Sequence, residues 1–134
     1  MNIYIWAASH EISIEQVNDL ISRDHNVGAK ILQLKDIDVD LHNVLCNIPI
    51  DANYTPMVRA LIKILDDIQT KHKDCNIHLV QPAGNPKLQY ILGIHMYLEP
   101  YTVLYSYSTR VSKDIPIEGG GTKTISIFKH IKFQ

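Results

Sequence analysis

Two polar loops hold the residues best suited to contact a ligand, and one of them runs from Gln81 to Lys87. Gly84 would let the backbone approach a bound group closely, and Asn85 is a good helix N-cap. Lys87 adds a positive charge beside the free N–H groups that begin such a helix, and this combination suits a phosphate. A capped helix after a tight turn, without any ligand, explains the same residues, so both interpretations stay open.

The other polar loop is Ser9-His10, which directly follows an apolar segment near the start of the chain. A histidine in this position could act as a general base or donate a hydrogen bond to a phosphate. Ser9 and His10 are therefore candidate catalytic residues only if the protein cleaves what it binds. A solvent-exposed polar loop is the simpler alternative.

Arg110 and the neighbouring tyrosines form a third group of candidates. An arginine can hold a phosphate through two parallel hydrogen bonds, and a tyrosine such as Tyr107 can stack on a base. The simpler roles are a surface arginine and tyrosines that fill core space with the hydroxyl at the rim. The seven histidines show no HExxH pattern and no cluster with cysteine, so we expect no metal and no cofactor.

Four strand-like segments can position these loops. Small residues, prolines and glycines bound each of them, and the third ends at Pro82, Ala83 and Gly84. The predicted strands are Ile3 to Ala8, Ala29 to Leu34, Ile77 to Val80 and Tyr101 to Ser108.

Helices are predicted between the strands. Ser13 and Gln16 form a capping-box pair before the first helix, and Asn26 to Gly28 should stop it. The clearest helix spans Thr55 to Lys71, and another follows Asn85. The apolar stripe of the first helix would be Ile14, Val17, Leu20 and Ile21. The helix from Thr55 to Lys71 has a broad apolar face that includes Leu61, Ile62 and Leu65. The segment from Lys35 to Pro49 could be either a short helix or an irregular covering segment.

This order of elements predicts an α/β protein of one domain, residues 1–134: a Rossmann-like three-layer sandwich with a mainly parallel sheet and a C-terminal β-hairpin. The hairpin would turn at Gly119-Gly-Gly, after a polar link at Thr109 to Lys113. Its second strand should have one apolar face, because Ile125, Ile127, Ile131 and Phe133 share the same parity. The loops after the first and third strands would open on the same edge of the sheet.

Composition narrows the classes of partner. Of 134 residues 46% are hydrophobic and 20% charged, and the net charge is −1, so no bulk attraction to duplex DNA or to an acidic membrane is expected. No apolar run approaches the ~18 residues of a membrane helix, and the first residues carry no basic region. Cys46 and Cys75 are isolated from each other and are best explained as reduced thiols. We therefore expect the protein in the cytoplasm.

The stretch from Asn76 to Gly93, with Tyr101 to Tyr107 after it, resembles the C-terminal part of SAVED domains. Those domains are relatives of the CARF domain and bind cyclic oligonucleotide second messengers in bacterial anti-phage defence, including CRISPR and CBASS systems. The shared features are a strand of the type Ile-His-Leu, a loop of small residues and proline, a Leu-Gly pair in the helix, and a strand ending in tyrosine. The opening strand and Ser9-His10 are similar to the start of CARF-type domains.

The resemblance implies a sensor that binds a cyclic oligonucleotide and regulates a separate effector protein. A SAVED domain has two CARF-like halves and this sequence has room for one, so a homodimer is expected to complete the pocket. A metal-independent ring nuclease that cleaves the messenger, and an interaction subunit without a ligand, are the alternatives. The expected ligand-binding residues are Ser9, His10, Gln81, Gly84, Asn85, Lys87, Tyr107 and Arg110.

Overall fold

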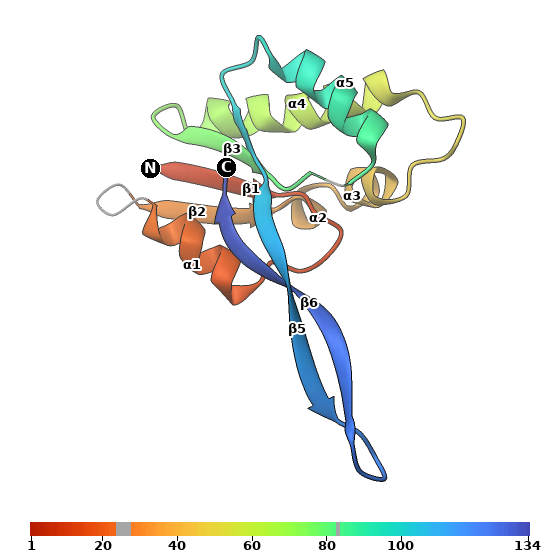
Figure 1. Ribbon diagram of the computed structural model, residues 1–134. Helices are drawn as coiled ribbons and strands as arrows, with labels where there is room; N and C mark the ends of the chain where they lie inside the picture. The colour runs from red at the N-terminus through yellow and green to blue at the C-terminus, as the bar shows by residue number, and fades with distance from the viewer. Residues whose placement is uncertain (24–27, 83) are drawn as a thin grey trace.

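A four-stranded parallel sheet lies at the centre of the computed structural model, which describes residues 1–23, 28–82 and 84–134. Its strands stand in the order β2-β1-β3-β4 (Figure 1). Their bounds are Asn2–Trp6 for β1, Ala29–Gln33 for β2, Asn76–Val80 for β3 and Thr102–Leu104 for β4. The helices are α1 (Ile14–Ser22), α2 (Leu34–Ile37), α3 (Val39–Cys46), α4 (Tyr54–Lys71) and α5 (Pro86–Met96).

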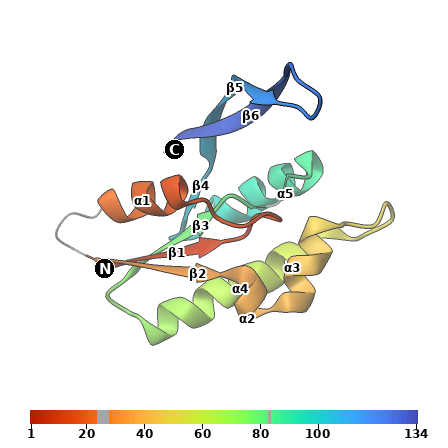
Figure 2. The same ribbon diagram turned by 90° about the horizontal axis from the view of Figure 1, so that it is seen from below.

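The two faces of the sheet are covered differently, as the alternation of side chains along β1 shows. Ile3 and Ile5 pack into a core with α3, α4 and α5, whereas Tyr4 and Trp6 pack on the other face with Leu20 of α1 and Phe133 near the end of the chain. Figure 2 shows α1 and the hairpin on one side of the sheet and α4 on the other. The predicted three-layer α/β sandwich is therefore confirmed, with the base of the hairpin completing one layer.

Local capping signals predicted the starts of α1 and α5 correctly. The Ser13 side chain accepts from Gln16 N at 3.1 Å while Gln16 Oε1 accepts from Ser13 N at 2.9 Å, which is the predicted capping box. Asn85 Oδ1 accepts from the second and third residues of α5, and Pro86 occupies the first position, as predicted. In α4 the cap is Asn53, so this helix begins one residue before the predicted Thr55.

The apolar stripe predicted for the first helix is only partly correct. Leu20 is buried, but Ile14 and Ile21 are 76% and 53% exposed, and the polar Gln16 is buried instead. Leu20 packs against the sheet, and Gln16, four residues earlier on the same side of the helix, is held by its capping-box hydrogen bonds with Ser13. The helix ends at Ser22, and the stop predicted at Asn26 lies outside the described residues, as does Ala83 of the predicted loop.

The segment between β2 and α4 is helical, which resolves the alternatives left for Lys35 to Pro49. It forms α2 and α3, and Leu34, Leu41 and Leu45 are buried against the sheet. No helix in the described part of the chain is long and apolar enough to cross a membrane.

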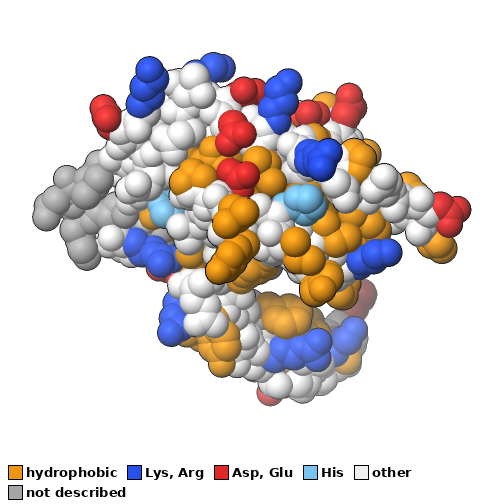
Figure 3. Space-filling view, turned by 90° about the horizontal axis from the view of Figure 1, so that it is seen from above, with side chains coloured by type: hydrophobic (Ala, Val, Ile, Leu, Met, Phe, Trp, Pro, Cys, Tyr) orange, Lys and Arg blue, Asp and Glu red, His pale blue; other side chains and the backbone are white. Residues whose placement is uncertain are grey.

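Helix α5 leaves much of its apolar surface exposed. Tyr90 and Ile94 on the helix, and Tyr97 and Leu98 just after it, are 57–88% exposed. Figure 3, which views the molecule from the side of α4 and α5, shows hydrophobic side chains gathered on this face. The face lies on the layer opposite α1 and the hairpin.

The segment Tyr101 to Ser108, predicted as one strand, serves two sheets. Strand β4 ends at Leu104, and β5 (Ser106–Pro116) then pairs with β6 (Thr122–Phe133) in an antiparallel hairpin that projects from the body (Figure 1). The chain changes partner at Tyr105, whose N–H and C=O both bond to Gln134, because β3 has already ended at Val80. The glycine tip is as predicted, but the supposed polar link at Thr109 to Lys113 is the middle of β5.

A β-bulge overturns the predicted parity of the last strand. Tyr107 pairs with Lys132 and Ser108 with His130, so Ile131 has no partner in register and the alternation shifts there. As a result Phe133 shares a face with His130 rather than with Ile127, and the Phe133 and His130 rings lie 4.6 Å apart. Phe133 is buried in the core while Ile127 and Ile131 are 40% and 49% exposed.

We expect Leu65→Ala to lower the free energy of unfolding by about 2–5 kcal/mol, because Leu65 is fully buried between α4 and the sheet. Chemical denaturation would measure the change. Lys63→Ala on the exposed side of the same helix is the matched control and should shift the midpoint little. An unchanged midpoint for Leu65→Ala would contradict the packing of α4 described above.

Candidate functional site

A cavity of about 630 Å³ opens at the carboxyl ends of β1 and β3, on the side of the sheet that carries α1 and the hairpin. Ligands in open parallel sheets bind at this edge, and it is the edge predicted from the sequence. Three parts of the fold meet here: the loops after β1 and β3, the start of α1, and the base of the hairpin. The lining residues are His10, Glu11, Ser13, Glu15, Gln16, Gln81, Ser106, Ser108, Phe128 and His130.

The loop after β1 holds His10 in a defined orientation. Trp6 Nε1 donates to the carbonyl oxygen of His10 at 2.8 Å, and His10 Nδ1 lies 2.9 Å from the carbonyl oxygen of Glu11. Since a carbonyl oxygen only accepts, Nδ1 carries the proton, and Nε2 of the neutral ring is an acceptor. His10 can therefore receive a proton or a hydrogen bond at Nε2.

Next to His10, Glu11 forms an ion pair with Lys35. The hydrogen bond from Lys35 lowers the pKa of the Glu11 carboxyl below its usual range, with the Lys35 charge adding to the effect. Among the described residues that line the cavity there is no lysine and no arginine. The negative charge of Glu11 is therefore balanced by Lys35, which is not a lining residue. Glu15 is the other carboxylate of the lining.

Gln81 turns the chain out of β3 in a strained conformation. Its φ is +50°, in the left-handed region that residues other than glycine seldom adopt. Its backbone N–H donates to Leu104 O, and its side-chain Oε1 accepts from Ser106 N, both at 2.7 Å. Because Gln81 and Gln16 each use the amide oxygen internally, the NH₂ group is what each can offer to a molecule in the cavity.

A chain of hydrogen bonds joins three distant residues beside the cavity. His130 Nε2 lies 2.8 Å from Asp19 Oδ2, and His130 Nδ1 lies 2.6 Å from Ser106 Oγ. Because the Asp19 carboxylate accepts, Nε2 carries the proton of a neutral ring, and Nδ1 then accepts the hydroxyl proton of Ser106. The His130 side chain is only 5% exposed, so these two partners satisfy both of its nitrogens.

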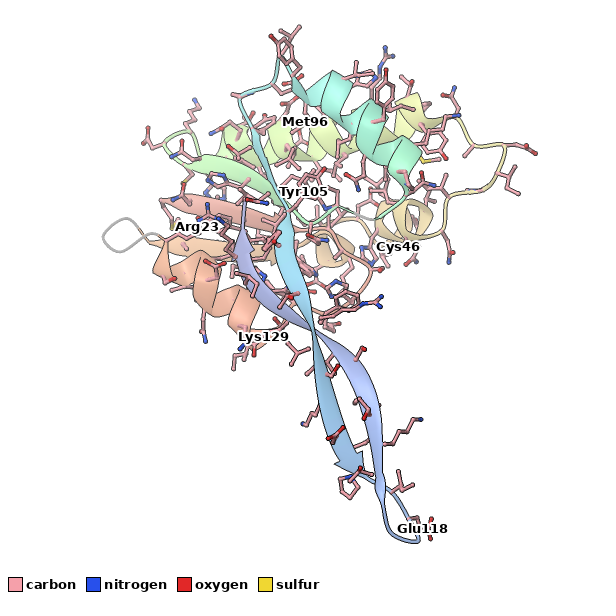
Figure 4. All side chains as sticks on the ribbon, viewed as in Figure 1. Arg23, Cys46, Met96, Tyr105, Glu118 and Lys129 are labelled. Atoms are coloured by element: carbon pink, nitrogen blue, oxygen red, sulfur yellow. The ribbon has the colours of Figure 1, made fainter. Side chains whose placement is uncertain are left out.

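This arrangement was missed in the sequence, and no local signal could have revealed it. Asp19 and His130 are 111 positions apart, and only the bulge at Ile131 turns His130 toward Asp19 and Ser106. The same carboxylate oxygen of Asp19 accepts from the backbone N–H of Phe133 at 3.1 Å. Figure 4 shows the base of the hairpin, near the labelled Tyr105, lying against the body, and Glu118 at the far tip.

Arg110 lies at the rim of the site. Its Cζ is 5.0 Å from the centre of the Phe128 ring, and Phe128 is 72% exposed and lines the cavity. This cation–π contact places a positive charge next to an accessible aromatic ring. Tyr107 is also more than half exposed on β5, but it pairs with Lys132 and is not among the lining residues.

The predicted residues at the start of α5 lie elsewhere. Lys87 Nζ is 5.1 Å from the centre of the Tyr54 ring, and Asn85 Nδ2 donates to the Tyr54 hydroxyl at 3.4 Å. They do not line the cavity, because α5 packs with α4 on the other face of the sheet, and Gly84 and Ser9 are not among the lining residues either. Of the eight predicted ligand-binding residues, His10 and Gln81 come together in the cavity and Arg110 reaches its rim.

Across residues 1–23, 28–82 and 84–134, no group of three or more His, Cys, Asp or Glu side chains is arranged so that it could hold a metal ion. The residues that line the cavity can offer hydrogen bonding, aromatic stacking and proton transfer by histidine.

Neither curated proteins nor solved structures include a significant match to this chain. A family model described as "Uncharacterized protein MJ1673 family" matches residues 2–134, which is almost the entire sequence. The chain therefore belongs to the MJ1673 family.

Proposed function

We propose that the protein binds a cyclic oligonucleotide second messenger in this cavity and acts as a sensor in anti-phage defence. The observation that carries the proposal is the exposed ring of Phe128, with Arg110 against it, on the wall of a cavity at the carboxyl edge of a parallel sheet. Aromatic rings and arginine are the groups that bind unpaired bases without requiring a particular sequence. The likeness of the sequence to SAVED and CARF domains supports a cyclic ligand.

Neutral donors and acceptors would recognise the bases and sugars. The NH₂ groups of Gln16 and Gln81 can donate to the edge of a base, and Nε2 of His10 can accept from a sugar hydroxyl. Glu11 and Glu15 stand in the part of the wall formed by the loop after β1 and the start of α1, so the phosphates are better placed on the hairpin side, which carries Ser106 and has the charge of Arg110 at its rim. Of the two cations that the sequence suggested for a phosphate, Lys87 and Arg110, this assignment keeps Arg110.

The size of the cavity supports a dimer. Pockets of about 300–1,000 Å³ enclose one drug-sized molecule, so a cavity of about 630 Å³ suits one or two nucleotides of a larger ring. Two copies with their cavities facing each other would enclose the rest. The exposed apolar face of α5 lies on the opposite layer, so it would stay accessible to a separate effector protein.

We expect Phe128→Ala to weaken binding about 5- to 150-fold, since one base–aromatic stack contributes about 1–3 kcal/mol. Isothermal titration calorimetry with cyclic di-, tri-, tetra- and hexanucleotides would measure it. Ile127→Ala, the neighbouring residue on the opposite face of the hairpin and outside the lining, is the matched control and should bind normally. If no ring of the panel bound to the wild type, a subunit that only binds other proteins would become the better explanation.

The same proposal predicts that ligand promotes dimerisation. Light scattering at micromolar concentration should give twice the monomer mass of 15.3 kDa once the ring is added. The stoichiometry from calorimetry should be one ring per two chains. A mass that stays at one chain, with one ring bound to each, would contradict the shared pocket.

A further inference from the structure

We propose that Ser106, His130 and Asp19 form a nucleophilic relay that cleaves a phosphodiester bond of the ligand in the cavity. In this relay Ser106 is the nucleophile, His130 the general base and acid, and Asp19 the group that orients the histidine. The identity of the substrate rests on the function proposed above, but the reactivity of Ser106 does not.

The geometry meets the requirements for an activated hydroxyl. The Ser106 Oγ to His130 Nδ1 distance of 2.6 Å and the His130 Nε2 to Asp19 Oδ2 distance of 2.8 Å are both within hydrogen-bond range. Asp19 fixes the tautomer, because its carboxylate keeps the proton on Nε2 and leaves Nδ1 free to take the proton of Ser106. The two histidine nitrogens have exchanged roles relative to the serine proteases, but the order nucleophile, base and carboxylate is the same.

Two of the three residues of the relay line the cavity. Ser106 and His130 line the cavity wall, while Asp19 lies behind them on α1 and also accepts from Phe133 N. A second hydroxyl, Ser108 Oγ, lies 3.0 Å from Ser106 Oγ and can donate to it while Ser106 donates to His130. A substrate in the cavity therefore meets the serine, and the carboxylate is shielded from it.

The reaction would take place in two balanced steps. In the first, Ser106 Oγ bonds to phosphorus as its proton moves to His130, the bond from phosphorus to one ester oxygen breaks, and that oxygen leaves with the proton from His130. In the second, water gives its proton to His130 and attacks phosphorus, the bond to Oγ breaks, and Oγ recovers the proton. One water is consumed, and the ring becomes a linear chain with a terminal phosphomonoester.

The charge that develops on the phosphoryl oxygens needs hydrogen-bond donors. Gln16 and Gln81 line the same cavity and could donate through their NH₂ groups, and Oε1 of Gln81 accepts from the backbone N–H of Ser106. This bond couples the position of the donor to that of the nucleophile. The strained backbone of Gln81 is explained if it serves to hold this contact in place.

The relay can be tested without any nucleotide, by treating the protein with diisopropyl fluorophosphate. Ser106 Oγ should displace fluoride, and peptide mass spectrometry should find the phosphoryl group on Ser106. Ser106→Ala should abolish the modification and His130→Gln should slow it by about 10²–10⁴-fold. Ser112→Ala, farther out on the same face of β5, should react at the wild-type rate.

Circular dichroism and thermal unfolding would establish that each variant is folded. Asp19→Asn retains a hydrogen-bonding side chain, so it tests the relay with less disturbance of the fold. A purely structural Ser–His–Asp contact would leave Ser106 of the wild type unmodified, and that result would overturn the proposal. Modification of another residue at the same rate in Ser106→Ala would overturn it as well.

The second test uses the cyclic oligonucleotide that calorimetry shows to bind. Serine attack does not use the ribose 2′-hydroxyl, so the 2′-deoxy ring should be opened too, giving a terminal phosphomonoester. A 2′,3′-cyclic phosphate product, or a ring bound but intact, would overturn the serine mechanism while leaving the binding function standing. If Ser106 reacts with the fluorophosphate but no ring binds, the relay is supported and the cyclic oligonucleotide is the wrong ligand.

Discussion

The contact between Asp19 and the base of the hairpin holds the parts of this protein together. One carboxylate oxygen accepts from His130 Nε2 at 2.8 Å and from Phe133 N at 3.1 Å. A two-stranded hairpin is at best marginally stable by itself in water. Here its base is anchored by these hydrogen bonds and by the buried ring of Phe133, so the outer part of the arm can extend from the body. Without this anchor the layer on the α1 side of the sheet would consist of one short helix.

The same contact creates the cavity. It brings Ser106 and His130 of the hairpin to the carboxyl edge of the sheet, where the loop after β1 supplies His10 and the end of β3 supplies Gln81. The hairpin thus acts as one wall of the site as well as an exposed arm. The proposed nucleotide binding rests on Phe128 and Arg110 of this wall, and the proposed hydrolysis rests on the hydrogen-bonded hydroxyl, imidazole and carboxylate.

Sensing and cleavage are compatible in one cavity. A sensor needs the ligand to bind and then to be removed, and slow cleavage by the relay would limit how long the bound state lasts. The face that carries α5 lies across the sheet from the cavity, so an effector contacting it would be coupled to the ligand through the strands and not by direct contact. This separation distinguishes the present fold from one in which the effector covers the ligand.

The sequence by itself determined the features that depend on neighbouring residues. The first three strands, the capping box of α1, the Asn85 cap and the glycine tip follow from local propensities and hydrogen bonds. The alternation of strands and helices implied a parallel three-layer sheet with the loops after the first and third strands at one edge. His10 and Gln81 were predicted as site residues because each lies in the loop after a predicted strand, and both line the cavity. Neighbouring residues in the sequence do not determine whether Asn85 and Lys87 reach the cavity, since this depends on the face of the sheet to which α5 packs.

Only the tertiary structure decided which loops share a cavity and which distant residues meet in it. Asp19 and His130 are separated by 111 positions, and their meeting requires the bulge at Ile131, which reverses the face of every later residue of β6. A bulge of this kind leaves no mark in the alternation of apolar residues, which read instead as one continuous stripe ending at Phe133. The contacts among Ser106, His130 and Asp19 therefore depend on the register between distant strands, and the pattern of residues along the sequence does not specify that register.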